Sequence, residues 1–180
     1  MSNLMNKEPR LKQAICPLRE TSIGGEPKVP MTTATIPVVN FDKVKEEYVK
    51  NMSLSECPKS SDAFYARHDE EMYLIEFKSG VIEDGKSHDI RRKMLDSLLL
   101  LTDIINKTIS NTRKELTYIL VYDESKNPAS VKIAETLSGW GGKKFVRFGL
   151  NRFETIYFKE VFTVTKEKFE GQFVQVWSSS

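Results

Sequence analysis

Residues 62–78 read DAFYARHDEEMYLIEFK. The pattern predicts a β-hairpin, because two strand-like runs flank a polar turn at His68–Glu71. The first run, 62–67, alternates apolar and polar side chains, whereas the second, 72–78, is richer in apolar residues, as a central strand is. We therefore expect this hairpin to lie in the interior of the sheet and to organise the fold.

The register of the hairpin brings charged side chains together. With the turn centred on Asp69, Asp62 lies opposite Glu76, and both side chains share one face with Lys78. Two carboxylates and the backbone carbonyl of Phe77 offer the hard oxygen ligands that Mg²⁺ or Mn²⁺ prefers. Such a metal lowers the pKa of bound water and neutralises charge on a phosphodiester, while a nearby lysine orients water or stabilises the transition state.

Asp62 and the Glu76-Phe77-Lys78 segment resemble the motif of the PD-(D/E)xK, or restriction-endonuclease-like, nuclease superfamily. The resemblance covers residues 40–123 and implies a helix, a three-strand meander, a crossover helix and a further strand. It also implies that Asp62 and Glu76 hold the metal and that Lys78 is catalytic. Without a supporting context, so short a motif also matches by chance.

Further details of the resemblance concern other positions. Some members of the superfamily add a glutamate from the first helix, for which Glu47 is the candidate and Glu46 the second choice. Ser61 stands where a proline often precedes the aspartate. The stretch 149–169 is similar to uncharacterised phage-type or Firmicute proteins, which implies no activity.

The flanking sequence predicts an α/β domain with a mixed central β-sheet flanked by helices. We expect a single domain over 40–180, preceded by an extended or partly disordered arm over 1–39, where proline and glycine interrupt any period. Thr32–Val39 is the candidate for the remaining strand of the meander. Apolar periodicity predicts the other elements: helices at 42–52, 88–106, 127–137 and 166–173, and strands at 115–122, 144–148 and 155–163.

Charge limits the kind of nucleic-acid binding that can be expected. Lysine and arginine number 27 against 25 acidic residues, so the net charge is +2, and proteins that coat a duplex are usually more basic. Binding would therefore depend on local patches of basic residues. For these same residues, the alternative interpretations are a solvated helix face and a half-buried strand. The candidate residues are Arg91, Arg92, Lys143, Lys144 and Arg147, with His88 as a residue that approaches the metal ligands from the long helix.

Other features bear on location and partners. The N-terminus lacks the pattern of a signal peptide, and the apolar run Met94–Ile105 is too short and too polar to span a bilayer. Cys16 and Cys57 do not make a disulfide framework. We expect a cytoplasmic protein with no membrane partner. The apolar tail Phe173–Trp177 is either a homodimer interface or an edge strand packed on the core.

Two functions follow from these patterns. The first is metal-dependent hydrolysis of phosphodiester bonds in DNA or RNA. The alternative is a catalytically inactive nuclease-like fold that serves as a protein- or nucleic-acid-interaction module, which the near-neutral charge favours slightly. Serine, zinc and thiol-redox chemistry of the common kinds is unsupported, because the motifs Gly-x-Ser-x-Gly, His-Glu-x-x-His and Cys-x-x-Cys do not occur.

Overall fold

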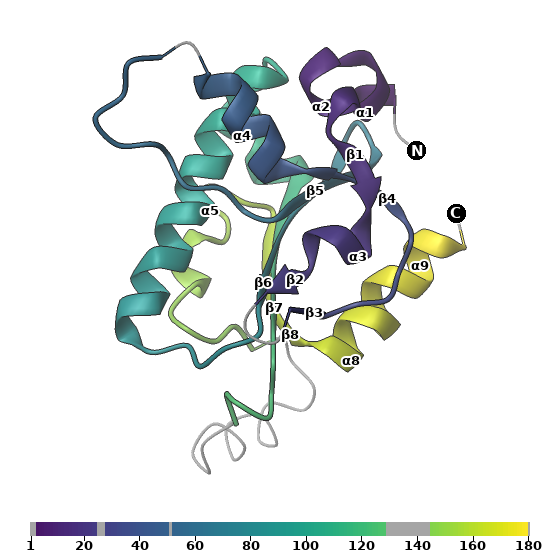
Figure 1. Cartoon of the computed structure of the whole chain (residues 1–180), viewed down its shortest axis with the longest axis vertical. Coiled ribbons are helices and arrows are strands. Elements are labelled where there is room, and N and C mark those ends of the chain that lie inside the picture. The colour runs from purple at the N-terminus through teal and green to yellow at the C-terminus, as the bar shows by residue number, and fades with distance from the viewer. Residues whose placement is uncertain (1–2, 25–27, 51, 129–144, 180) are drawn as a thin grey trace.

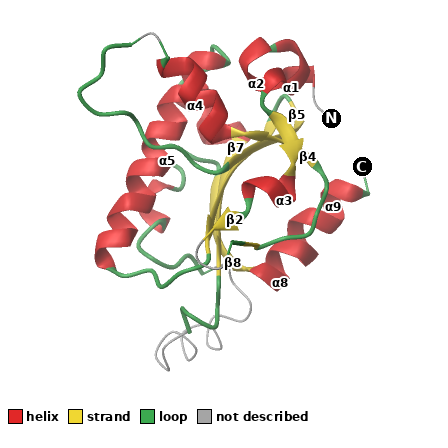
Figure 2. Cartoon of the chain, in the orientation of Figure 1, coloured by secondary structure: helices red, strands yellow, loops and turns green. Residues whose placement is uncertain are grey.

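A six-stranded mixed β-sheet organises the chain, with helices on both of its faces (Figures 1 and 2). The computed structural model describes residues 3–24, 28–50, 52–128 and 145–179. In spatial order the strands are β1 (Ile15–Pro17), β4 (Pro37–Asn40), β5 (Ala63–His68), β6 (Glu71–Lys78), β7 (Leu116–Tyr122) and β8 (Glu160–Thr165). The pairs β1–β4, β4–β5 and β5–β6 are antiparallel, whereas β6–β7 and β7–β8 are parallel.

Different helices cover the two faces of the sheet. One face carries α4 (Phe41–Val49) and the long α5 (Asp84–Ile104), which crosses over from β6 to the parallel strand β7. The opposite face carries a C-terminal helical segment (Figure 1). That segment consists of α8 (Lys166–Phe169), a π-helical turn (Glu170–Val174) and α9 (Gln175–Ser178).

The hairpin predicted for residues 62–78 is confirmed, together with its register. Ala63 pairs with Ile75, and the amide of Asp62 donates a hydrogen bond to the Ile75 carbonyl at 3.0 Å. Continued by one residue, this pairing sets Asp62 opposite Glu76, as predicted. A β-bulge close to the turn leaves the pairing at the open end unchanged.

Several other elements agree with prediction. The strand predicted at 115–122 is β7, and all of its residues are buried, as expected for the interior of a sheet. The helix predicted at 42–52 is α4, and Asn40 caps it, since its side chain accepts a hydrogen bond from the amide of Lys43 at 3.0 Å. The helix predicted at 166–173 begins as α8, which Thr165 caps in the same way.

Other predictions were wrong or displaced. Residues 145–148 are not a strand, and Phe148 has a φ of 60°, which turns the chain instead of extending it. The last strand begins at Glu160 and not at 155, and the helix at Ile109–Glu115 (α6) was missed. The helix predicted at 127–137 falls mostly on residues outside the described ranges.

The C-terminal tail is helical and packs on the sheet, so its prediction as an edge strand was wrong. The Trp177 ring lies 4.5 Å from that of Tyr65 and 4.9 Å from that of Tyr73, measured between centroids. Phe169 meets Phe77 edge-to-face at 5.6 Å. These aromatic contacts bury the sheet face opposite α5, so the tail packs against the core of its own chain.

The N-terminal region is folded, which corrects the prediction of an extended or partly disordered arm over 1–39. Its described residues form the helices α1 (Asn3–Lys7), α2 (Pro9–Gln13) and α3 (Leu18–Thr21). Strand β1 extends the main sheet, and β2 (Ile23–Gly24) and β3 (Val29–Pro30) form a separate small ribbon. Each piece is too short to show a period in the sequence.

The N-terminal helices contribute to the core, so we predict that they stabilise the whole domain. Leu11 is completely buried, and Leu11→Ala should lower the free energy of unfolding by about 2–5 kcal/mol. Urea denaturation followed by circular dichroism measures this change. The control is Val29→Ala, since Val29 is exposed and should change the stability by less than about 0.5 kcal/mol. Equal, small effects of both substitutions would mean that the N-terminal region does not fold with the core.

Candidate functional site

Four charged side chains converge at the end of the β5–β6 hairpin that lies away from its turn. Lys78 Nζ lies 2.7 Å and Lys93 Nζ lies 2.8 Å from the same oxygen, Glu76 Oε1. Lys93 Nζ also lies 3.5 Å from Asp62 Oδ1. The prediction that Asp62, Glu76 and Lys78 share one face is therefore met, and helix α5 adds a second lysine.

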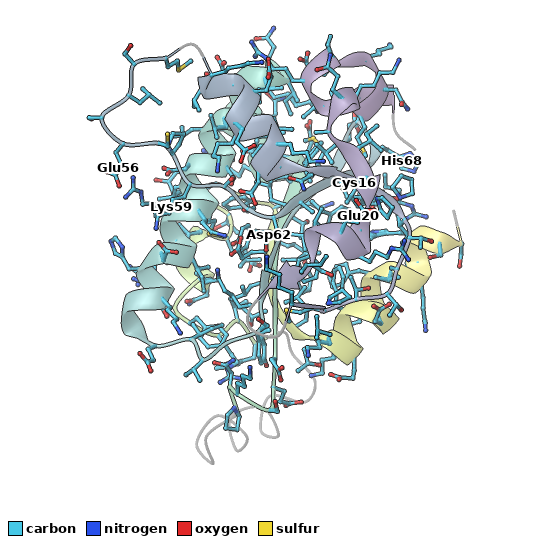
Figure 3. All side chains as sticks on the ribbon, in the orientation of Figure 1. Cys16, Glu20, Glu56, Lys59, Asp62 and His68 are labelled. Atoms are coloured by element: carbon cyan, nitrogen blue, oxygen red, sulfur yellow. The ribbon has the colours of Figure 1, made fainter. Side chains whose placement is uncertain are left out.

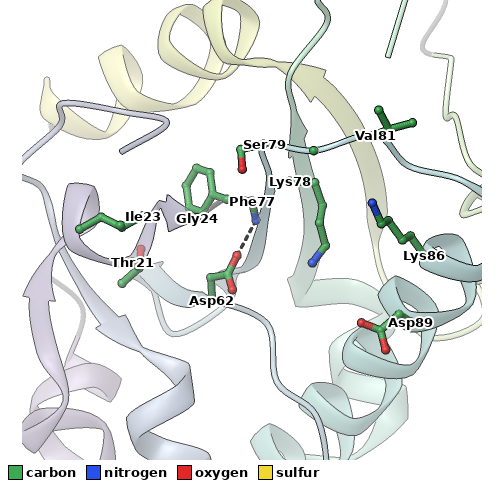
Figure 4. A pocket seen from close by; sticks show the side chains of 11 residues that line it. Thr21, Ile23, Gly24, Asp62, Phe77, Lys78, Ser79, Val81, Lys86 and Asp89 are labelled. Carbon is green, nitrogen blue, oxygen red and sulfur yellow. Dashed lines mark hydrogen bonds between the residues drawn. The ribbon is translucent and has the colours of Figure 1, made fainter. Parts of the chain in front are cut away.

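Secondary structure fixes these groups in place. Glu76 lies in β6 between two other strands and is completely buried. Asp62 directly precedes β5, and its Oδ2 accepts a hydrogen bond from the Phe77 amide at 2.6 Å (Figure 4). This bond to rigid backbone orients the carboxylate and leaves Oδ1 facing Lys93. The Asp62 side chain keeps 17% of its surface exposed, so the site is reached from solvent.

The electrostatics of the cluster are those of buried, coupled charges. Burial raises the pKa of Asp62, and the neighbouring Glu76 carboxylate raises it further, against the opposing effect of Lys93. Burial alone would lower the pKa of Lys93, but the carboxylates of Glu76 and Asp62 outweigh it and raise this pKa above its usual range. Lys93 therefore remains a cation at neutral pH.

Glu76 Oε2 is buried in the cluster and has no hydrogen-bond partner within the described part of the chain. The buried hydroxyl groups of Tyr118 and Ser61 lie close to one another. Burial raises the pKa of Tyr118 well above its usual range, and the charges of Glu76 and Asp62 add to this shift. Tyr118 therefore presents an un-ionised hydroxyl beside both carboxylates. An acceptor such as Glu76 Oε2 is costly to bury unless something binds it.

The donor set fits a hard divalent cation, although it is small. Glu76 Oε2 is an uncommitted carboxylate oxygen, and Asp62 Oδ1 has only the longer contact to Lys93. Across the described ranges, no group of three or more His, Cys, Asp or Glu side chains is arranged to hold a metal. Two carboxylates and the Phe77 carbonyl would leave positions for water and substrate, as is common for Mg²⁺.

A pocket of about 390 Å³ opens beside the cluster (Figure 4). Asp62 and Lys78 line it from the hairpin, and Lys86 and Asp89 line it from α5. The N-terminal segment 21–24 forms another wall, which nothing in the sequence indicated. Asp89 pairs with Lys59, and this ion pair lowers the pKa of Asp89. Figure 3 shows Asp62 near the centre of the molecule.

Glu47, the predicted additional metal ligand, is not brought to the pocket. It pairs with Lys50 at 3.2 Å on α4, and both side chains are more than half exposed. The acid of α4 that acts on the cluster is Asp42, which contributes to the raised pKa of Lys93 and accepts a hydrogen bond from Ser60. Glu46 and Glu47 lie about one helical turn further along α4 than Asp42. Apolar periodicity alone did not identify which of these acids faces the cluster.

The predicted nucleic-acid-binding residues have varied surroundings. Arg92 pairs with Glu56 at 2.6 Å, and Arg91 has a buried Nε with no partner among described residues. Arg147 donates to the carbonyl of Asn127 at 2.7 Å and lies over the rings of Tyr122 and Phe148, so its guanidinium is engaged within the fold. Lys143 and Lys144 lie outside the described residues, and His88 is exposed on α5.

Lys93 and Tyr118 are the site residues whose roles the sequence did not reveal. Lys93 belongs to the basic run that begins at Arg91, which is typical of a solvated helix face. Its position three residues after the buried Ile90 was the available signal, because that spacing turns a side chain toward the core.

The chain matches no protein-family model, curated protein or solved structure. The helices in the described part of the chain include none that is long and apolar enough to cross a membrane. What the site does must therefore be argued from its own geometry.

Because Lys93 belongs to this buried cluster, we predict that it contributes more to stability than Lys59, whose ion pair is more exposed. In metal-free buffer, Lys93→Met should lower the free energy of unfolding by about 3 kcal/mol, since it leaves buried carboxylates without their shared cation. Lys59→Met is the control, because the Lys59–Asp89 pair is more than a third exposed and contributes less than about 1 kcal/mol. Chemical denaturation measures both, and a Lys93 effect no larger than that of Lys59 would contradict the assignment of a buried network.

Proposed function

We propose that the chain is a Mg²⁺- or Mn²⁺-dependent phosphodiesterase that acts on DNA or RNA. The observation that carries the proposal is the convergence of Asp62, Glu76 and Lys78 beside a pocket, with Glu76 Oε2 uncommitted. Buried carboxylates at the open end of a strand pair are costly to maintain for structure alone. Two such groups, one lining the pocket and the other buried behind it, are better explained by a bound cation and an anionic substrate.

Each residue has a distinct part in this proposal. Asp62 and Glu76 would hold the metal, with the Phe77 amide fixing the orientation of the Asp62 carboxylate. A divalent metal bound there supplies a Lewis acid and a water of lowered pKa. Lys78, which lines the pocket and is 24% exposed, is placed to contact a phosphate oxygen or to orient the attacking water. Lys86 adds positive charge on the far wall of the pocket.

The arrangement of strands supports the resemblance to restriction-endonuclease-like nucleases. Strand β4 pairs with β5 and supplies the third strand of the meander, and α5 crosses over to the parallel strand β7. One difference is that α4 lies between β4 and β5 along the chain, whereas the resemblance implies a helix before the meander. We propose that the common core is present with this connection altered.

A second candidate function is a non-catalytic interaction module of similar fold. The observation that favours it is that two lysines already supply positive partners to the two carboxyl groups. A network of this kind can be retained for structure after activity is lost. The two functions differ in whether a metal ion binds and whether phosphodiester bonds are cleaved.

Cleavage assays test the proposal. With Mn²⁺ present, the wild type should cleave a mixture of linear DNA and RNA, and Glu76→Ala and Lys78→Ala should each lower the rate at least about a hundredfold. Addition of EDTA should abolish cleavage. Gel electrophoresis of end-labelled substrates measures the rates, and circular dichroism verifies that each variant is folded.

A matched control comes from the same strand. Glu71 lies at the other end of β6, where it contacts Arg67 and Tyr73, and Glu71→Ala should keep the wild-type rate. Absence of Mn²⁺-dependent cleavage in the wild type, or equal residual cleavage by all variants, would refute the phosphodiesterase and favour the interaction module.

A further inference from the structure

Lys93 is the side chain that joins the two carboxylates of the candidate metal site. Its ammonium contacts Glu76 Oε1 at 2.8 Å and Asp62 Oδ1 at 3.5 Å, so it lies between the two acids. Lys78 contacts Glu76 Oε1 and lines the pocket. Lys93 does not line the pocket, and only 19% of its side chain is exposed.

The position of Lys93 is the one that a bridging cation would take. A divalent ion held by Asp62 and Glu76 needs oxygens from both carboxylates at about 2 Å. Two lysine ammonium groups already contact the carboxylate pair, so a divalent ion would bring further positive charge into a buried site. A like charge 2.8 Å from Glu76 Oε1 and 3.5 Å from Asp62 Oδ1 opposes that binding directly.

Lys93 can leave the carboxylates through rotation of its own side chain. Lysine has a flexible four-carbon chain, and 19% of the Lys93 side chain is exposed, so its ammonium can turn from the carboxylate pair toward solvent.

We propose that Lys93 is a resident counter-ion that competes with the divalent metal for Asp62 and Glu76, and that metal binding displaces its ammonium from the two carboxylates. This inference rests on the proposed metal site and goes beyond it. The lysine keeps the carboxylates together and compensated in the metal-free protein. It also sets a threshold, because the metal must outcompete an internal cation before the site is loaded.

Metal affinity measured without any substrate tests the inference. Binding of Mn²⁺ is followed by electron paramagnetic resonance of free Mn²⁺ and, in parallel, by the metal-induced rise in Tm. Lys93→Gln, which removes the charge and keeps a hydrogen-bond donor, should bind Mn²⁺ at least about tenfold more tightly than the wild type. Lys93→Arg keeps the charge and should retain weak, wild-type-like affinity.

A control variant makes the experiment specific. Lys107→Gln is the matched control, since Lys107 is a similarly buried lysine that pairs with Glu115, away from the cluster; its affinity should change less than about threefold. If Lys93→Gln is unfolded without metal, refolding by Mn²⁺ at concentrations that leave the wild-type Tm unchanged provides the same information.

The outcomes separate this inference from the proposed function. Tighter binding by Lys93→Gln supports the competition, whether or not nucleic acid is cleaved. Equal or weaker binding by Lys93→Gln overturns the competition and leaves the metal site in place. Absence of Mn²⁺ binding in the wild type and in every variant overturns both the competition and the metal-dependent phosphodiesterase.

Discussion

The ion cluster around Glu76 is the constraint on which the arrangement of the site depends. Glu76 is completely buried in a central strand, where an ionised carboxylate is tolerated only with close positive partners. One of its two lysines comes from the same strand and the other from helix α5. The cluster therefore ties α5 to the open end of the hairpin, and it fixes which turn of that helix lies above the sheet.

The rest of the fold keeps this cluster at the boundary between core and solvent. Aromatic side chains of the C-terminal helical segment bury the opposite face of the sheet, with Trp177 packed on Tyr65 and Tyr73. The face below α5 is closed by the buried Tyr118 and Ile90. The end of the hairpin opens into the pocket, so solvent and small anions can approach Asp62 there. A low-dielectric wall on the other sides strengthens every charge interaction there.

How much could be predicted from the sequence depended on whether the information was local. The pairing of Asp62 with Glu76 was predictable because a hairpin register follows from its turn and its alternation. The role of Lys93 was not, since it depends on how α5 packs on β6, and a basic run on a helix is typical of a solvated surface. The alternation at 145–148 was misleading, because Phe148 adopts a turn conformation and Arg147 binds carbonyls. The N-terminal helices escaped prediction because none is longer than five residues.

The pocket has walls from segments far apart in the chain, and this has an evolutionary consequence. The charged groups are carried by the hairpin and α5, whereas one wall is formed by residues 21–24. Changes in that N-terminal wall can alter the size and polarity of the entrance without touching the carboxylates or the lysines. Selection can therefore retune which ligands enter by varying a short terminal ribbon, while the charged centre stays constant.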